Sequence, residues 1–488
     1  MPDILFGEWL PDQAPLGNPG CTVAKNVYPS ASGYLPVSAL TSSTDALDAR
    51  PQGAIQLTDK DLNVIQFAGD ASKLYENESN AWGDKSKVGG YTTGSTERWE
   101  FAQWNNKVIA TNFSDNPQNR DLGGTTFSDL TTALRARHVA VIRDFVTFAN
   151  TYDATDGNKP NRIRWSAFGD ETDYTVSAST LSDFQDLATG GPVNRIFGGE
   201  YGVIFQKENI WRMSFTGAPT VFQFDQTIPG IGLIAAGAAA QDGDTIYFLS
   251  DRGFFSVTNG SQVTPIGAEK IDRTVLSELD SNNLHRISCA IDPTTNRVFW
   301  AYPGAGSNGR PNKIVVYDRA INRWSQIEQD VELLWSAGGI GFTLESLSTA
   351  NPDLDAMTVS LDSNRWKGGA AILGAFDSDY KSGSFDGSPM AACLTTKEVE
   401  ISSGARTPIN SFSPIVDGGT VTGKVITRNS QADAVTEGLA LTLRPSGRFT
   451  TRANARYHRF ELSISGVWDH ALGVNIDKKT PRATRYGR

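Results

Sequence analysis

Short apolar runs alternate with polar turn residues along most of the chain, and this pattern predicts strands rather than helices. Similar runs recur at intervals of 39 to 56 residues. The recurring runs are Asn63–Phe67, Lys107–Thr111, Val146–Asn150, Gly202–Gln206, Thr245–Leu249 and Arg297–Ala301. A period of about 40 to 50 residues with four strands per period is typical of a β-propeller. The pattern therefore predicts an all-β chain whose main part is a β-propeller of about six to eight blades.

The clearest single blade covers residues 286–328. Four strand-length segments lie there, each separated from the next by turn residues. In the first turn Asp292 is placed to accept local N–H bonds, and the proline after it fixes φ. One blade cannot bury both of its faces alone, so blades must stack on one another around an axis. Six such units can be counted, and residues 357–402 are a candidate seventh.

Four tryptophans recur with the blades, and we expect them to pack in the core between neighbouring blades. They are Trp165, Trp211, Trp300 and Trp324. Helical patterns are rare. Ile271, Val275 and Leu279 have helical spacing, so residues 268–285 are expected to form the longest helix, and residues 127–137 a second, short one.

The two ends of the chain lie outside the repeat. Residues 1–55 are rich in proline and glycine but carry apolar anchors, among them Phe6 and Trp9. Disordered tails are poor in such residues, so this segment is expected to be an extended docking arm. The propeller is expected over 56–402. Residues 403–488 contain further strand-like runs, which would either close the propeller or form a β layer beside it.

Composition narrows the class of protein. The hydrophobic share of 39% excludes wholesale disorder. Three scattered cysteines and four histidines without ligand spacing give no disulfide framework, metal site or cofactor site. No apolar run is long enough to span a bilayer, and the start lacks the pattern of a signal peptide. We therefore expect a protein made in a reducing cytoplasm that works without a cofactor.

The charge is uneven along the chain. The formal net charge is −10, but residues 444–488 carry +7 and the rest carries −17. Arg482, Arg485 and Arg488 have no apolar partners nearby in the sequence, so they are expected to be exposed and to lie at an interface. A basic tail on an acidic body is typical of contact with nucleic acid or an acidic partner, although a solvated terminus has the same composition.

Two glycine-rich segments match nucleotide-binding motifs by letter only. Residues 304–309 match a dinucleotide fingerprint and residues 418–424 most of a P-loop, but both motifs need a following helix and strand-like residues follow here. Residues 153–157 resemble a calcium loop, but they lack the alternating ligands and are better explained as a turn. No catalytic residues are therefore assigned, and we expect no enzyme. A distant carboxylate pair for glycoside hydrolysis stays open.

The two ends of the chain together resemble a known family. The opening Asp3-Ile-Leu-Phe-Gly-Glu-Trp-Leu-Pro-Asp12, with Asn26–Pro29 and Gly33–Pro36, is similar to the start of tail hub or nozzle proteins of short-tailed bacteriophages. These are also called packaged-DNA stabilisation proteins. The segments Arg456–Phe460 and Gly466–Ala471, and the basic end at 480–488, are similar to the close of the same proteins.

The resemblance implies a role in the virion. Such proteins form a homo-hexameric ring below the portal and its adaptor, extend the channel for double-stranded DNA and retain the packaged genome until ejection. The implied partners are further copies of the chain, the adaptor ring and the tip or needle protein, with tailspikes or fibres as additional ones. The implied location is the virion tail, after synthesis in the host bacterial cytoplasm.

Two other classes stay open. One is a monomeric propeller of the kelch or WD type that acts as an interaction scaffold. The other is a carbohydrate-active propeller, which would carry a cluster of carboxylates on its axis.

Overall fold

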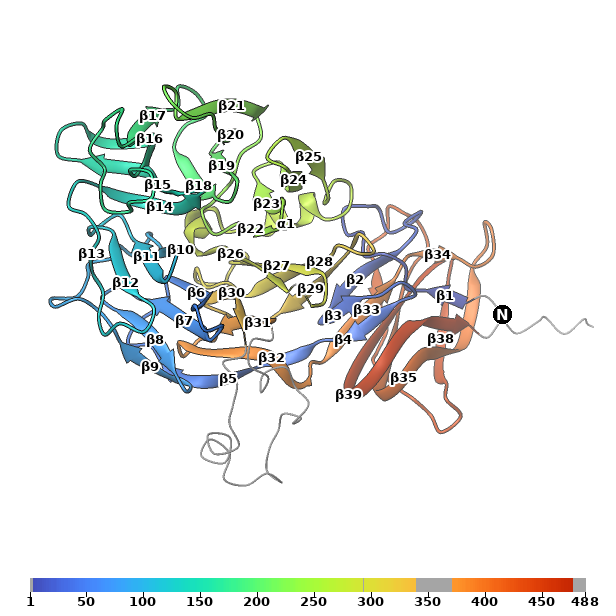
Figure 1. The fold of residues 1–488 in the computed structure, drawn as a ribbon. Coiled ribbons are helices and arrows are strands. Elements are labelled where there is room, and N and C mark those ends of the chain that lie inside the picture. Colours follow the sequence, from blue (N-terminus) through green and yellow to red (C-terminus); the bar gives the residue numbers. More distant parts are fainter. Residues whose placement is uncertain (1–2, 293, 339–370, 477–488) are drawn as a thin grey trace, which may run out of the picture.

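The computed structural model describes residues 3–292, 294–338 and 371–476, and within them the chain is almost entirely β structure (Figure 1). Six separate four-stranded antiparallel sheets follow one another around a common centre. One further unit of four strands, which precedes the last of these sheets in chain order, has the same form but continues into a larger sheet. The predicted fold class, an all-β propeller with additional β-rich ends, is confirmed.

The first five blades are formed by consecutive strands joined by hairpins. The first blade contains β6 (Gly53–Thr58), β7 (Val64–Gly69), β8 (Leu74–Glu78) and β9 (Ala81–Asp84), and the second β10 (Glu100–Trp104), β11 (Lys107–Thr111), β12 (Gln118–Asp121) and β13 (Ser128–Asp129). The third contains β14 (Arg135–Ile142), β15 (Phe145–Asp153), β16 (Gly157–Trp165) and β17 (Asp183–Asp186), and the fourth β18 (Val193–Phe197), β19 (Tyr201–Gln206), β20 (Asn209–Phe215) and β21 (Phe222–Pro229). The fifth contains β22 (Ala239–Asp242), β23 (Thr245–Ser250), β24 (Gly253–Thr258) and β25 (Gln262–Pro265).

The remaining two units complete the ring. The unit predicted over residues 286–328 is present as β26 (Ser288–Asp292), β27 (Arg297–Tyr302), β28 (Lys313–Asp318) and β29 (Arg323–Glu328). The last blade contains β30 (Leu333–Gly338), β31 (Ala371–Phe376) and β32 (Lys381–Pro389), and its outer strand is β5 (Ser38–Ala46) from the start of the chain. The innermost strand β30 contacts both β26 and β6, so the first and last blades are neighbours.

The candidate seventh blade at 357–402 is therefore correct only in part. Strands β31 and β32 belong to a blade, but the strands after residue 391 leave it for another sheet, and residues 357–370 lie outside the described residues. The fourth strand of this blade is β5, from the start of the chain, which pairs with β32. This pairing covers an edge of β32 that would otherwise be open.

A second layer, here called the terminal sheet, lies beside the propeller and joins the two ends of the chain (Figure 1). It contains β1 (Asp3–Leu5), β2 (Cys21–Lys25), β3 (Val27–Pro29), β4 (Tyr34–Pro36), β33 (Ala392–Thr396), β34 (Val399–Glu400), β35 (Thr407–Arg428), β36 (Thr436–Glu437), β37 (Leu441–Thr442), β38 (Phe449–Ala455) and β39 (Tyr457–Ile476). Strand β2 pairs with β29 on one side and with β33 on the other, so it connects the propeller to this sheet.

The helix prediction at 268–285 is correct in place but not in length, and the one at 127–137 is wrong. Residues 268–285 form a short helix α1 (Asp272–Glu278) and a separate 3₁₀ helix (Ser281–Arg286). They are separate because Leu279 is extended and the Asp280 side chain caps the next turn by accepting from Asn282 N. The prediction of a helix at 127–137 is wrong: this segment contains β13 and the start of β14, in which buried and partly buried residues alternate. No helix of the described residues is long and apolar enough to cross a membrane.

Helix α1 receives its N-terminal cap from a distant part of the chain. Ile271, at the N-cap position, makes no side-chain cap bond. Instead the Asp12 carboxylate accepts from the backbone N–H groups of Arg273 and Thr274, both at 2.8 Å. These are donors that the first turn of a helix cannot satisfy internally. The N-terminal segment is thereby fixed to the fifth and sixth blades.

Candidate functional site

Among the described residues, the segments that carry the family resemblance lie together around the terminal sheet. Strand β1 pairs antiparallel with β39, from Asp3 opposite Asn475 to Leu5 opposite Gly473. Phe6 N donates to Leu472 O at 2.8 Å. In β4, Tyr34 lies opposite Ala471. Residues from the two ends of the sequence therefore form one folded unit.

Phe6 and Trp9, the expected interface anchors of the N-terminal docking arm, are buried inside the chain. Their exposed fractions are 1% and 4%. They belong to the same apolar cluster as Phe460 and Trp468 of the terminal sheet. The docking surface of the N-terminal segment is thus the chain's own C-terminal strands, because large apolar side chains are stabilised by burial wherever a partner face is available.

Apolar side chains are also exposed on the terminal sheet. Val467 is 77% exposed and Leu439 86%, and Leu5 of β1 is 55% exposed. Singly exposed apolar residues are ordinary on protein surfaces. Substitutions at these exposed positions can test whether the terminal sheet binds a partner, because they leave the core unchanged.

The four blade tryptophans all lie in blades, with their indole N–H groups bonded. Trp300 and Trp324 are fully buried and donate to Ala238 O and Ile266 O of the preceding blade region. Trp165 is 4% exposed and donates to Leu181 O within its own blade. Trp211 is only partly buried and donates to the Gln206 side chain. Arg482, Arg485 and Arg488 lie outside the described residues.

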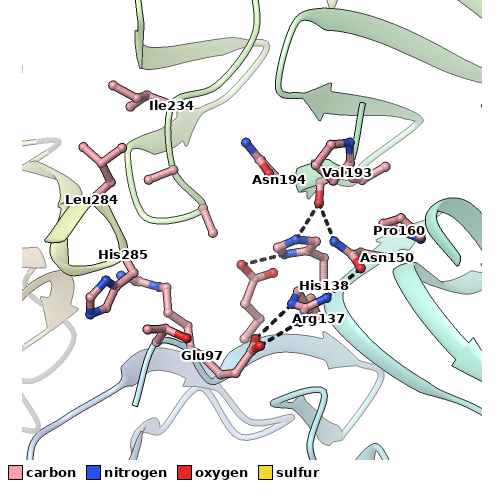
Figure 2. Close-up of a pocket in the computed structure, with 16 residues that line it drawn as sticks. Glu97, Arg137, His138, Asn150, Pro160, Val193, Asn194, Ile234, Leu284 and His285 are labelled. Carbon is pink, nitrogen blue, oxygen red and sulfur yellow. Dashed lines mark hydrogen bonds and ion pairs between the residues drawn. The ribbon is translucent and has the colours of Figure 1, made fainter. Parts of the chain in front are cut away.

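A cavity of about 450 Å³ opens among the innermost strands of the second to fourth blades (Figure 2). Arg137 of β14 holds Glu97 through two bonds, at 3.0 and 2.7 Å. Deeper in, Glu100 lies 3.1 Å from both His138 Nδ1 and Arg195 Nη1. His138 Nε2 lies 3.1 Å from Val193 O, which also accepts from the Asn150 side chain.

Glu100 remains ionised in spite of its burial. Burial alone would raise its pKa, but Arg195 and His138 stabilise the carboxylate and bring the pKa below its ordinary value. On the other side of the cavity the surroundings of His285 favour its neutral form. Burial lowers its pKa, and the cations Arg50, Arg286 and Arg98 lower it further.

A second cavity, of about 530 Å³, is lined by Arg50, Arg286 and Arg310 with Glu332. The Glu332 carboxylate is buried and pairs with Arg286 and with Arg310 Nε, the latter at 2.7 Å. His285 and Arg286 are consecutive in the 3₁₀ helix and line the first and second cavities respectively. The two cavities are therefore adjacent.

Sequence reasoning did not find this cationic region, although a signal for it exists. In five blades an arginine lies within three residues of the start of the innermost strand: Arg50, Arg98 and Arg286 before the strand, and Arg137 and Arg195 inside it. In the seventh blade Glu332 takes that position. We call these five arginines the axial arginine ring. The recurrence was overlooked because the repeat was read from the second strand of each blade.

The motif matches occupy structure that does not suit nucleotides. Residues 304–309 lie in the loop between β27 and β28, and residues 418–424 lie within β35. The Asp153 carboxylate accepts from Thr155 N and Asp156 N and pairs with Arg162, so it stabilises a hairpin turn. Within the described ranges, no group of His, Cys, Asp and Glu side chains is placed to hold a metal ion.

Comparison with known proteins gives neighbours of fold only. No family model matches the chain, and no curated protein matches it. Among solved structures, BamB from Moraxella catarrhalis is 9% identical over 73% of this chain and 92% of its own, with a TM-score of 0.37. The Neurospora crassa Pan2 WD40 domain is 9% identical over 72% of this chain and 89% of its own, with a TM-score of 0.36. Similarity at this level has no bearing on function.

Proposed function

We propose that the chain is a structural protein of a bacteriophage tail, a nozzle or hub. In this proposal several copies form a ring, hexameric in the resembling family, that extends the DNA channel below the portal and adaptor and retains the packaged genome. The observation that supports it best is the pairing of β1 with β39. The two segments that resemble the family are far apart in sequence, yet they form one sheet that could serve as one attachment surface.

The charge distribution fits this role. Apart from residues 444–488 the chain carries −17. An acidic channel lining repels phosphate at close range, so DNA would slide along it rather than bind. The basic end would attach the subunit to an acidic neighbour, mainly by steering and register, and salt screens such contacts within about 8 to 10 Å.

The experiment is assembly of the purified chain, alone and with portal–adaptor complex, followed by sedimentation and negative-stain imaging over a salt series. We expect a ring, or a ring on the portal–adaptor complex, that weakens as salt rises. Deletion of 480–488 should leave a folded propeller that assembles poorly. A chain that stays monomeric with and without the portal–adaptor complex would overturn the proposal.

A matched pair of surface variants makes the test specific to the terminal sheet. Val467→Asp changes a residue that is 77% exposed on β39, and Leu62→Asp changes one that is 83% exposed between β6 and β7. Both should fold with unchanged thermal stability. We expect Val467→Asp alone to weaken assembly. Equal assembly of both variants would show that this face of the terminal sheet is not used.

A monomeric interaction scaffold remains the second candidate function. It is favoured by one observation, the contact of β30 with β6, through which the propeller closes within a single chain. The sedimentation experiment separates the two candidates, since a scaffold of this type needs no copies of itself.

A further inference from the structure

The innermost strands of a propeller all start at the same end of its axis, so the axial arginine ring gathers five guanidinium groups there. Four of the groups are near enough to influence one another: Arg98 interacts electrostatically with Arg195 and Arg50, and Arg50 with Arg286. Like charges that approach in a partly buried place destabilise one another. Such a concentration of positive charge calls for a counter-charge.

The carboxylates of the region neutralise only part of the ring. Glu97 is paired with Arg137, Glu100 with Arg195, and Glu332 with Arg286 and Arg310. Asp330 also lines the second cavity, and it is exposed. The region thus contains six arginines, namely the five of the ring and Arg310, but only these four carboxylates among the described residues named here.

Two members of the ring, Arg50 and Arg98, form no direct ion pair with a carboxylate among the described residues, and Glu332 and Glu100 attract them only from farther away. The Arg50 guanidinium donates to Ser95 O at 2.7 Å, and that of Arg98 donates to Ile287 O at 3.1 Å. Each guanidinium has five N–H donors, so most of them make no hydrogen bond to the described residues. The pKa of each group falls to about 10, first because of burial and then because of the neighbouring cations, so both stay charged at neutral pH.

Other polar atoms around the second cavity are also unsatisfied. Arg286 Nε and Ser307 Oγ are buried without a hydrogen-bond partner in the described part of the chain. Arg98 Nε, beside the first cavity, is also buried without a hydrogen-bond partner among the described residues. Buried polar atoms in native proteins are nearly always bonded to protein, water or ligand, so these donors are available to a ligand that enters either cavity.

We propose that the axial arginine ring binds a small phosphate-type oxyanion in the second cavity, held by Arg50 and Arg286 with Ser307. Phosphate oxygens accept several charge-assisted bonds at once, and the planar fork of arginine matches them. A cavity of about 530 Å³ has the size of a small-molecule site and is too small for a nucleic-acid duplex. The proposal does not depend on ring assembly or on a role in a virion.

The test uses the full chain with inorganic phosphate and pyrophosphate as probes. Binding is measured by isothermal titration calorimetry and by the shift in melting temperature, with sodium chloride at matched ionic strength as the reference. We expect saturable binding, tighter for pyrophosphate. No saturable binding of either probe to the wild-type chain at up to about 10 mM would overturn the proposal, whatever the variants do.

The variants locate the site. Arg50→Gln and Ser307→Ala should each weaken pyrophosphate binding, the former by tenfold or more. Arg252→Gln is the control, because Arg252 is exposed on the fifth blade and lines neither cavity. Ser307→Ala removes only a loop hydroxyl, so it keeps the test valid if Arg50→Gln does not fold. Binding that is the same in all variants would show a nonspecific surface effect and overturn the site.

A short double-stranded DNA fragment completes the comparison. Since the cavity does not admit a duplex, DNA should bind no more tightly than pyrophosphate, and any DNA binding should be insensitive to Ser307→Ala. DNA that binds more tightly than pyrophosphate and loses affinity in both variants would overturn the assignment to a small ligand.

Discussion

The propeller and the terminal sheet are both largely antiparallel β structure, but their strands pair over very different distances in the sequence. In the blades most partners are joined by short hairpins, as where Ser250 lies opposite Gly253. In the terminal sheet, Leu5 lies opposite Gly473. The entropic cost of closing a loop rises with the length of the loop, and pairing between residues far apart in sequence slows folding. The blades can therefore form early, whereas the terminal sheet forms only when both ends of the chain are present.

The two regions are nevertheless joined through one apolar core. Phe6 and Phe460 of the terminal-sheet region belong to the same buried cluster as Trp300 and Trp324 of the propeller. A shared core couples the stability of regions that form at different stages. Mutations can show how strong this coupling is.

The largest effect is expected for Trp324→Ala. Trp324 is fully buried, its ring lies 4.6 Å from that of Tyr317 and 4.9 Å from that of Phe254, and its indole donates to Ile266 O. Truncation should lower the free energy of unfolding by about 3 to 5 kcal/mol, measured by urea denaturation. Trp211→Ala, at a partly buried site, should cost less. If the terminal sheet kept its amide protection while the propeller lost it, the core would not be shared.

Phe6→Ala should have a large but more local effect. Phe6 is 1% exposed, and its removal should cost about 3 kcal/mol. Amide hydrogen exchange should accelerate in β39, while β14–β16 stay protected. Leu5→Ala is the neighbouring control, because Leu5 is 55% exposed. Equal acceleration in both regions would mean that the chain unfolds as one unit.

Acid should destabilise the chain through His458. This residue is fully buried between β34 and β35, and burial lowers its pKa from 6.5 to about 4. The unfolded chain binds the proton near pH 6.5 and the folded chain only near pH 4, so stability falls as the pH drops through this window, by up to about 3 kcal/mol. His458→Gln should flatten this part of the pH profile in urea denaturation. The control His470→Gln, at an exposed position, should leave the pH profile of stability unchanged.

Asp12→Ala should have a smaller effect. It removes the cap that accepts from Arg273 N and Thr274 N. Loss of a helix cap costs about 1 kcal/mol. Thermal unfolding should show the change, and Asp61→Ala on an exposed turn should not. An unchanged melting temperature for Asp12→Ala would show that the N-terminal segment is held by its apolar contacts alone.

Lys424→Ala should have the smallest effect. Lys424 pairs with Glu437 at 2.9 Å and Glu461 at 3.2 Å on the surface of the terminal sheet. Exposed ion pairs contribute about 0 to 1 kcal/mol. Stability in urea and assembly by sedimentation should both be close to wild type. Loss of assembly with unchanged stability would give this residue a functional role that its structure does not explain.

The blades could be predicted from the sequence because their second strands are buried on both faces. The recurring run at Lys107–Thr111 coincides with β11, and the runs at 146–150, 202–206, 245–249 and 297–301 lie within β15, β19, β23 and β27. Doubly buried strands have continuous apolar sequences that are visible without knowledge of the partner.

The terminal sheet could not be predicted in this way. Nothing in the sequence around Ile4 or Phe6 specifies that the partner is β39, because strand pairing has no local code when the partner is more than 400 residues away. Phe6 and Trp9 were correctly seen as anchors that need a partner, but the partner proved to be the same chain. The axial arginines were missed because a charged residue near the start of a short inner strand becomes meaningful only when the blades are arranged around the axis.

The pairing of β5 with β32 also bears on how the chain is made. Residues 38–46 leave the ribosome more than 300 residues before Lys381 does. At about 5 to 20 residues per second, this interval lasts roughly 20 to 70 seconds, during which β5 has no partner strand. A chain whose translation stops early cannot close its last blade and keeps an open strand edge, which chaperones and proteases can recognise. Closure of the last blade by β5 therefore depends on synthesis of the chain through β32.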